Sequence, residues 1–174
     1  MKTRSLLRLT CFFLMLLPFL VKAQHPLSPT DAFIITGKVK TEKTITLQHL
    51  KQYKVAELRN INTSCSPKKE ERIKKVKAVL LKHILDSVIF QYEKPRMLNQ
   101  FYFMFVASDG YKLLYSYNEI FNTETGNNLY IVIQMDGKPI EEMENRILLL
   151  TTKDIRSGSR NMKGLTEIVV GKVD

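Results

Sequence analysis

The chain has 174 residues, 44% of them hydrophobic, and carries a formal net charge of +10. This length and composition are sufficient for one domain with a sizeable core. The positive charge is mixed with acidic residues, as in the run PKKEERIKK at 67–75. Such mixing is typical of a solvated surface and argues against a nucleic-acid-binding protein.

The first 23 residues have the pattern of a secretory signal peptide. Three basic residues precede an apolar run at 11–21, and Val21 and Ala23 occupy the −3 and −1 positions of a cleavage site. The run is shorter than the ~20 residues that cross a bilayer, which favours a cleaved signal over a membrane anchor. We therefore expect an exported bacterial protein, periplasmic or secreted, with residues 24–174 as its domain and no membrane insertion after cleavage.

The mature part keeps 23 of the 27 Lys and Arg residues and all 17 Asp and Glu residues, which leaves a net charge of about +6. This charge permits an anionic ligand without requiring one. Cys65 is the one cysteine left after cleavage, so no internal disulfide can form. A lone thiol of this kind is buried as a small apolar side chain, paired with another chain, or used as a ligand.

In chain order, the first expected elements are strands at 32–39, 44–46 and 54–61. Between the second and third of these, apolar residues recur at helical spacing in TLQHLKQY, with Thr46 as the N-cap of a short helix. His49 falls between the apolar positions of this helix, and we expect it to face solvent.

The second half of the chain is dominated by strands. An amphipathic helix is predicted first, over 76–89, because apolar residues recur there at i, i+3 and i+4. The following run at 101–107 is apolar on both faces, which predicts a central strand buried from both sides. Further strands are expected at 111–115, 129–135, 146–151 and 165–170. The sequence therefore predicts a strand-rich α+β domain with a few short helices.

Local motifs explain most of the polar residues between these strands. Asp109-Gly110 and Asp136-Gly137 each follow a strand and predict hairpin-type turns. Ser116 and Glu119 match a capping box at a helix start, so they need no catalytic role. No metalloprotease, CxxC, phosphate-loop or Ser/His/Asp pattern is present, and three histidines disfavour a histidine metal site. No catalytic residue is assigned.

Six segments in order carry a family resemblance: ITGKVKTEKTITLQHL, KKVKAVLLKHIL, VASDGYKLLYSYNEIF, DGKPI, LLLTTKD and SGSRNMKGLTEIVV. Together they resemble the molybdopterin-binding domain of sulfite-oxidase-type oxidoreductases, over nearly the whole mature chain. The resemblance implies a compact strand-rich α+β fold with a molybdenum-molybdopterin cofactor in a cleft. In that family one cysteine thiolate binds the metal, and basic and polar groups hold the pterin phosphate.

The resemblance assigns site residues by position. Cys65 stands where the metal-ligating cysteine would be, and a thiolate suits such a soft metal centre. Arg160 and Lys163 fall where the family places its phosphate-binding groups, with Arg156 as a further candidate. The turn at 109–111 matches one that shapes the wall of the cleft.

The sequence also departs from this family. Cys65 lacks the arginine and aromatic neighbours that usually frame the metal, Ala78 replaces a frequent glycine, and Gly164 replaces an aromatic residue. The signal peptide has no twin-arginine pair, which indicates export of an unfolded chain. A cofactor made in the cytoplasm would then have to be captured outside.

These observations predict a non-catalytic exported module that binds a small anionic ligand or another envelope protein. The alternative is a molybdenum-cofactor-dependent oxidoreductase that transfers oxygen atoms or electrons, with Cys65 on the metal. A third interpretation is a subunit joined to another chain through a disulfide of Cys65.

Overall fold

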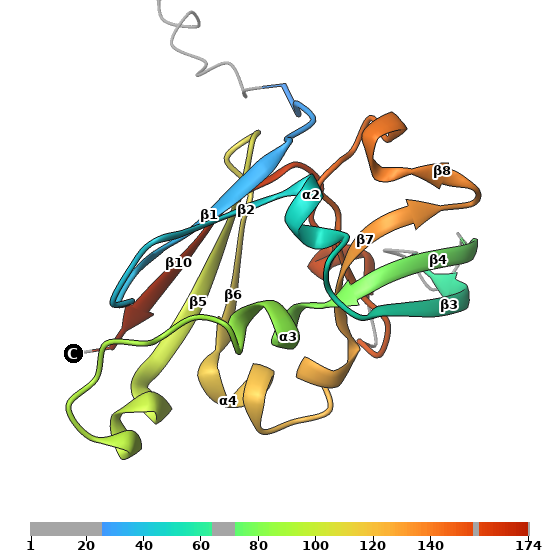
Figure 1. Ribbon diagram of the computed structural model, residues 1–174. Helices are drawn as coiled ribbons and strands as arrows, with labels where there is room; N and C mark the ends of the chain where they lie inside the picture. Colours follow the sequence, from blue (N-terminus) through green and yellow to red (C-terminus); the bar gives the residue numbers. More distant parts are fainter. Residues whose placement is uncertain (1–25, 64–71, 155–156, 174) are drawn as a thin grey trace, which may run out of the picture.

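The computed structural model describes residues 26–63, 72–154 and 157–173, and the strands in these ranges form two sheets (Figure 1). The first sheet has the order β2-β1-β10-β5-β6. In it, β1 and β10 run parallel and the other neighbours run antiparallel. Its strands are β1 (Ala32–Gly37), β2 (Lys43–Thr46), β5 (Phe101–Ala107), β6 (Lys112–Ser116) and β10 (Leu165–Lys172).

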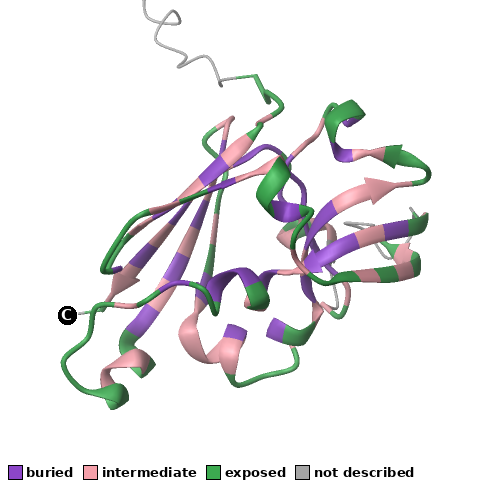
Figure 2. Cartoon of the chain, viewed as in Figure 1, coloured by how far each residue is buried: buried purple, intermediate pink, exposed green. Residues whose placement is uncertain are grey.

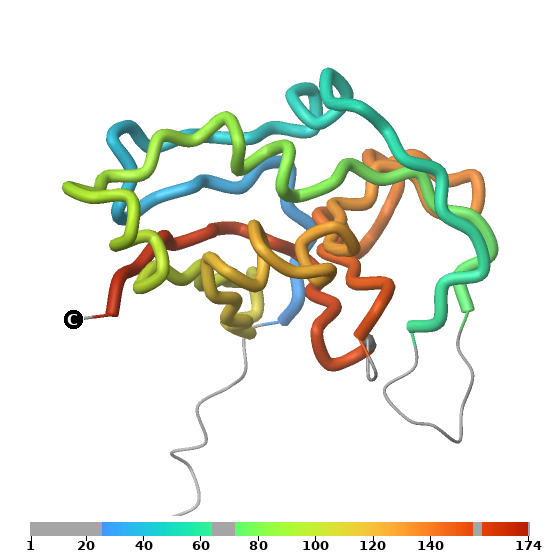
Figure 3. The backbone as a smooth tube through the Cα atoms, turned by 90° about the horizontal axis from the view of Figure 1, so that it is seen from below, coloured from blue at the N-terminus to red at the C-terminus, as the bar shows by residue number. Residues whose placement is uncertain are grey.

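The second sheet is built around β7. It has the order β3-β4-β7-β8, all antiparallel, and β9 pairs with the first part of β7. Figure 3, seen from below, shows the two sheets as neighbouring lobes. The strands of the second sheet are β3 (Val55–Asn62), β4 (Arg72–Leu80), β7 (Leu129–Met135), β8 (Lys138–Pro139) and β9 (Leu149–Thr151).

The helices are short and lie mostly at the junction of the two sheets (Figure 1). This arrangement confirms the predicted strand-rich α+β class. Within the described ranges, no helix has the length and apolar character needed to cross a membrane. The helical elements are α2 (Leu47–Leu50), α3 (Leu81–Leu85), α4 (Tyr117–Phe121) and the 3-10 turns η2 (Pro95–Gln100), η3 (Gly126–Asn128), η4 (Ile140–Glu142) and η5 (Ser157–Arg160).

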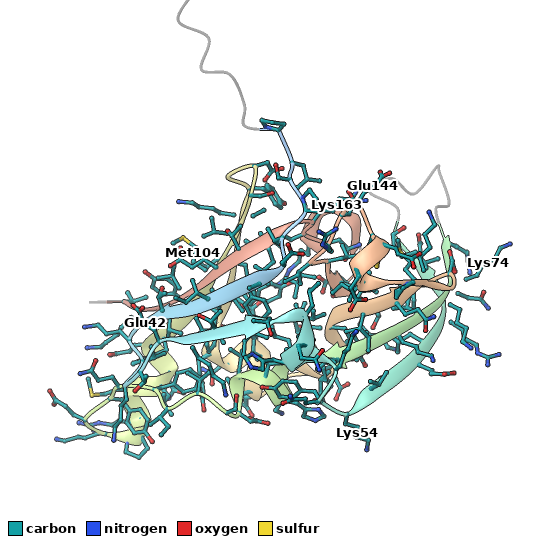
Figure 4. The ribbon with its side chains drawn as sticks, turned by 45° about the horizontal axis from the view of Figure 1, so that its top comes forward. Glu42, Lys54, Lys74, Met104, Glu144 and Lys163 are labelled. Carbon is teal, nitrogen blue, oxygen red and sulfur yellow. The ribbon has the colours of Figure 1, made fainter. Side chains whose placement is uncertain are left out.

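The main core lies between the inner face of the first sheet, the short helices and one face of β7 (Figure 2). Along β5 only alternate residues are buried, so the prediction that this strand is buried from both sides is wrong. Phe103 and Phe105 point into the core, whereas Met104 lies half-buried on the outer face, as Figure 4 shows. The residues on that outer face of β5 are half-buried.

A second, smaller core cluster lies on the opposite face of the second sheet. It joins residues of β4 and β7 to the segment at 143–150, and its buried members are Val76, Ala78, Val132, Met143, Leu148 and Leu150. The second sheet is therefore packed on both faces, unlike the first.

This two-sided packing explains why the helix predicted over 76–89 is wrong. Residues up to Leu80 complete β4, and only Leu81–Leu85 is helical. Val76 and Ala78 face the second cluster while Val79 faces the main core. A strand buried on both faces followed by a helical turn gives an apolar spacing that resembles one long amphipathic helix.

The predicted turns and caps are confirmed. Asp136 and Gly137 both have positive φ, 47° and 91°, as the two central residues of a tight β7–β8 hairpin require. At α2, the Thr46 hydroxyl accepts from the His49 N–H at 3.2 Å, and His49 Nδ1 accepts from the Thr46 N–H at 3.3 Å. His49 is exposed, as expected. The strand predicted over 146–151 is shortened to β9.

Thr30 ties the segment ahead of β1 to the start of β10. Its backbone N–H donates to the Arg146 carbonyl at 2.7 Å. Its hydroxyl donates to the Leu165 carbonyl at 2.8 Å and accepts from the Ile147 N–H at 3.0 Å. The side chain thus satisfies two backbone groups that are more than 100 residues away in sequence.

Replacing Thr30 with valine keeps the shape of the side chain and removes its three side-chain hydrogen bonds, to the Leu165 and Arg146 carbonyls and from the Ile147 N–H. We expect the free energy of unfolding to fall by about 1–3 kcal/mol, because the Ile147 N–H loses its partner. Urea denaturation measures the change. The control is Thr44→Val on the exposed side of β2, which should change stability by less than about 0.5 kcal/mol; equal effects at both positions would contradict this role of Thr30.

Candidate functional site: a cleft beside the second sheet

A cleft of about 430 Å³ opens where the second sheet, the β5–β6 turn and the segment leading into β10 meet. This volume is within the range that accommodates small ligands. Its lining comes from seven separate parts of the chain: Leu27, Thr63, Ile73, Asp109, Tyr111, Met135, Asn145, Leu148, Leu150, Gly158, Asn161 and Lys163.

The floor of the cleft is apolar. Leu148 and Leu150 are buried members of the second core cluster, and Ile73 and Met135 pack against it while staying half-buried. The cleft therefore borders this cluster, and Ile73 and Met135 are the half-buried apolar side chains between the two. An apolar surface of this kind favours a ligand with an apolar part.

The rim of the cleft is polar. Lys163 is exposed just ahead of β10 (Figure 4), and no described residue forms a hydrogen bond or ion pair with its side chain. The Asn161 side-chain oxygen accepts from the Thr151 N–H at 2.9 Å, which leaves its amide N–H groups as donors. Asp109 uses one carboxylate oxygen to accept from the Tyr111 N–H at 2.9 Å. Lys163 is the single Lys or Arg among the described residues of the lining.

Two contacts fix the walls. The Tyr111 hydroxyl donates to the Ser159 carbonyl at 2.7 Å, which joins the β5–β6 turn to η5. Ser28 and Ser108 exchange two hydrogen bonds, of 2.9 and 2.7 Å, which hold the N-terminal segment with Leu27 against the same turn.

Gly164 makes room for this N-terminal segment. Its φ is +63°, and a Cβ atom there would lie 2.6 Å from Ser108 Oγ and 2.8 Å from the Ser28 carbonyl oxygen. The space that an aromatic residue would need at this position is thus occupied by residues 27 and 28. An aromatic side chain, which is usual at this position in the family that the sequence resembles, would therefore not fit at Gly164.

Arg160 lies outside the lining of the cleft and binds groups of its own chain. Its Nη2 is 3.2 Å from Glu119 Oε1, and its Nε is 3.3 Å from Asp154 Oδ2. The guanidinium carbon lies 3.9 Å from the centroid of the Tyr115 ring, a cation–π contact. The guanidinium is therefore engaged by two carboxylates and an aromatic face.

Glu119 has a double role. Its Oε2 accepts from the Ser116 N–H at 2.7 Å, and the Ser116 hydroxyl accepts from the Glu119 N–H at 3.1 Å, which confirms the predicted capping box. Partial burial raises the pKa of Glu119, but the hydrogen bonds with Ser116 and Arg160 outweigh burial and hold the pKa below its ordinary value. Glu119 is thus a stable anion for Arg160.

Tyr115 is fully buried, and its hydroxyl has no hydrogen-bond partner among the described residues. Burial raises the pKa of Tyr115 to about 12, although the charge of Arg160 acts in the opposite direction. An enclosed hydroxyl without a partner lowers stability, because it has lost its hydrogen bonds to water.

Replacing Tyr115 with phenylalanine should therefore leave the free energy of unfolding unchanged at neutral pH or raise it by up to about 1 kcal/mol. A raised pKa in the folded state stabilises the fold below the ordinary tyrosine pKa of ~10, and this stability is lost as the pH rises toward 12. The variant should consequently lose less stability than the wild type in this alkaline window. Denaturant unfolding across this pH range measures both effects, with the exposed Tyr92→Phe as control; a variant as alkali-sensitive as the wild type would contradict the assignment.

The predicted site residues have different surroundings in the structure. Lys163 lines the cleft, whereas Arg160 is held by Glu119 and Asp154. Cys65 and Arg156 lie outside the described residues, although Thr63, two positions before Cys65 in the sequence, lines the cleft. The assignment of Cys65 to a metal, and of Cys65, Arg160 and Lys163 to a cofactor, stays a prediction.

The described residues do not fit the phosphate of a molybdopterin. A phosphate dianion is held by several convergent cations, and here one lysine shares the cleft with the carboxylate of Asp109. In the three described ranges, no group of three or more His, Cys, Asp or Glu side chains is placed to hold a metal ion.

Some features of the site were missed at the sequence level. The partners of Arg160 on β6, α4 and the segment after β9 come from positions up to 45 residues away, and no local pattern relates them. One signal was present: a capping-box glutamate has a second carboxylate oxygen free to bind a cation.

Comparison with known proteins supports the fold alone. No family model and no curated protein matches the sequence. Among solved structures, the sulfane dehydrogenase SoxCD from Paracoccus pantotrophus is similar, with 9% identity, a TM-score of 0.53 and 80% of this chain covered. The match covers 37% of the SoxCD chain, so this protein corresponds to little more than a third of it. The chain thus has a strand-rich α+β fold that is distantly related to part of an oxidoreductase.

Proposed function

We propose that this protein is an exported, non-catalytic module whose cleft binds a small anionic ligand, or an acidic group of another envelope protein. One observation carries the proposal: Lys163 is exposed, pairs with no described residue, and stands at the rim of a cleft with an apolar floor. Arg160 does not contribute, because Glu119 and Asp154 already bind its guanidinium.

The proposal is tested by titrating the mature protein with a panel of small carboxylates and inorganic phosphate while amide NMR signals are followed. Signals of Asn145 and Asn161 should shift on binding. Lys163→Gln should weaken binding at least about tenfold, because a charge-assisted hydrogen bond is lost. The matched control is Lys94→Gln in an exposed loop that does not line the cleft. Binding that is unaffected by Lys163→Gln, or shifts confined to other surfaces, would refute the proposal.

The second candidate is a molybdenum-cofactor-dependent oxidoreductase. The fold similarity to a sulfane dehydrogenase favours it, as does the position of Thr63 at the cleft two residues before Cys65. Elemental analysis of protein purified from its native envelope is the direct test, in the wild type and in Cys65→Ser. Stoichiometric molybdenum that is lost in the variant would support this function over the first. Metal retained in the variant would eliminate Cys65 as its ligand.

A further inference from the structure

We infer that the ligand of the cleft is amphipathic, with an apolar body that lies on the floor and a single anionic head group at Lys163. This inference rests on the proposed function and specifies the ligand class for the same site. It follows from the separation of apolar and polar groups within one cleft.

The apolar body is indicated by the floor. Ile73, Met135, Leu148 and Leu150 belong to or pack against the second core cluster, and they extend it to the cleft. A ligand with an apolar chain would complete this cluster and remove apolar surface from water, which is the main source of binding free energy for such a contact. With a small, fully polar anion, the apolar floor of the cleft would stay in contact with water.

The single charge of the head group is indicated by the rim. Lys163 is the one cation among the described lining residues, and no described residue pairs with it. Asn145 and Asn161 add neutral amide groups that can donate hydrogen bonds to oxygen atoms. Asp109 lines the same cleft and carries a negative charge, so a second negative charge on the ligand would be repelled. A monoanion, such as a carboxylate, matches this set of groups.

The test uses straight-chain carboxylates from acetate to decanoate, below their micelle concentrations, with decanol and inorganic phosphate as comparison ligands. Calorimetric titration of the mature protein gives the dissociation constants. Affinity should rise about fourfold per methylene group until the cleft is filled. Decanoate should bind about tenfold more tightly than decanol, and Lys163→Gln should abolish this difference.

Two further variants locate the chain of the ligand. Met135→Gln and Ile73→Thr replace half-buried floor residues with polar side chains that strands accept. Both should weaken decanoate severalfold and leave acetate unchanged, while Lys94→Gln should change neither. Circular dichroism verifies that each variant is folded.

The outcomes separate the inference from the proposed function. Phosphate or acetate could bind as tightly as decanoate, with Lys163→Gln weakening that binding. The cleft then binds anions, and the inference of an amphipathic ligand is wrong. If affinity rises with chain length but decanol binds as tightly as decanoate, the inference of an anionic head group is wrong. If floor variants have no effect on decanoate while Lys163→Gln weakens its binding, the cleft binds the anionic group and the apolar body of the ligand is wrong. If no member of the panel binds, the proposal of this cleft as the ligand site fails as well.

Discussion

Replacing Arg160 with methionine is expected to lower the free energy of unfolding by about 2–3 kcal/mol. Asp154 is the reason for this large effect: its side chain is only 16% exposed, and Arg160 lies against it as a positive charge. Without the guanidinium, this mostly buried carboxylate loses its ion pair with the one cation that binds it among the described residues, and Glu119 loses its second partner. Methionine retains apolar contact with the Tyr115 ring, so the loss reports on charge and hydrogen bonding.

A double-mutant cycle tests this explanation. Asp154→Asn removes the buried charge, so Arg160→Met should be much less harmful in that background than in the wild type. Arg160→Lys should fall between the wild type and methionine, since lysine keeps the charge but lacks the planar fork. Urea unfolding of the four proteins of the cycle gives the coupling energy. Additive effects of the two changes would show that Arg160 and Asp154 do not stabilise each other.

The second large effect is expected at Gly164. Replacing it with alanine should lower the free energy of unfolding by about 2–3 kcal/mol, from backbone strain at positive φ and from overlap with Ser108 and Ser28. Relief of the overlap would move the N-terminal segment away and take Leu27 out of the cleft wall. Ligand affinity should fall together with stability.

Gly110 provides the matched control for Gly164. It also has a positive φ, +84°, but a Cβ atom there would meet nothing within 4 Å. Gly110→Ala therefore measures the strain alone, which we expect to cost about 1–2 kcal/mol. The difference between the two variants, from denaturant unfolding, is the steric part. If the two variants are equally destabilised, the N-terminal segment does not press on Gly164 as described.

Local features of the fold were predictable from the sequence. The capping box at Ser116 and the turn at Asp136-Gly137 depend on residues close in the chain, and both are confirmed. The helix expected over 76–89 failed because periodicity cannot distinguish a strand packed on both faces from an amphipathic helix. That distinction depends on the second core cluster, which only the folded chain assembles.

The site was predictable only in part for the same reason. Lys163 could be singled out by its position in a family pattern, and it does line the cleft, while its role in binding stays a prediction. Arg160 shares that pattern, yet its surroundings are set by Asp154 and by Glu119, 41 residues away. Two basic residues of one sequence pattern can thus differ in surroundings, one at a cleft and one bound to groups of its own chain, and the tertiary partners decide which.

The position of β10 has a consequence for how the chain folds. It lies between β1 and β5 and is the strand through which β1–β2 and β5–β6 join into one sheet (Figure 1). Its parallel pairing with β1 aligns Ile34 with Glu167, so a very long loop must close before these strands meet. Such high contact order slows folding. Until β10 is added, the β1–β2 and β5–β6 hairpins each keep one edge without its partner strand in this sheet.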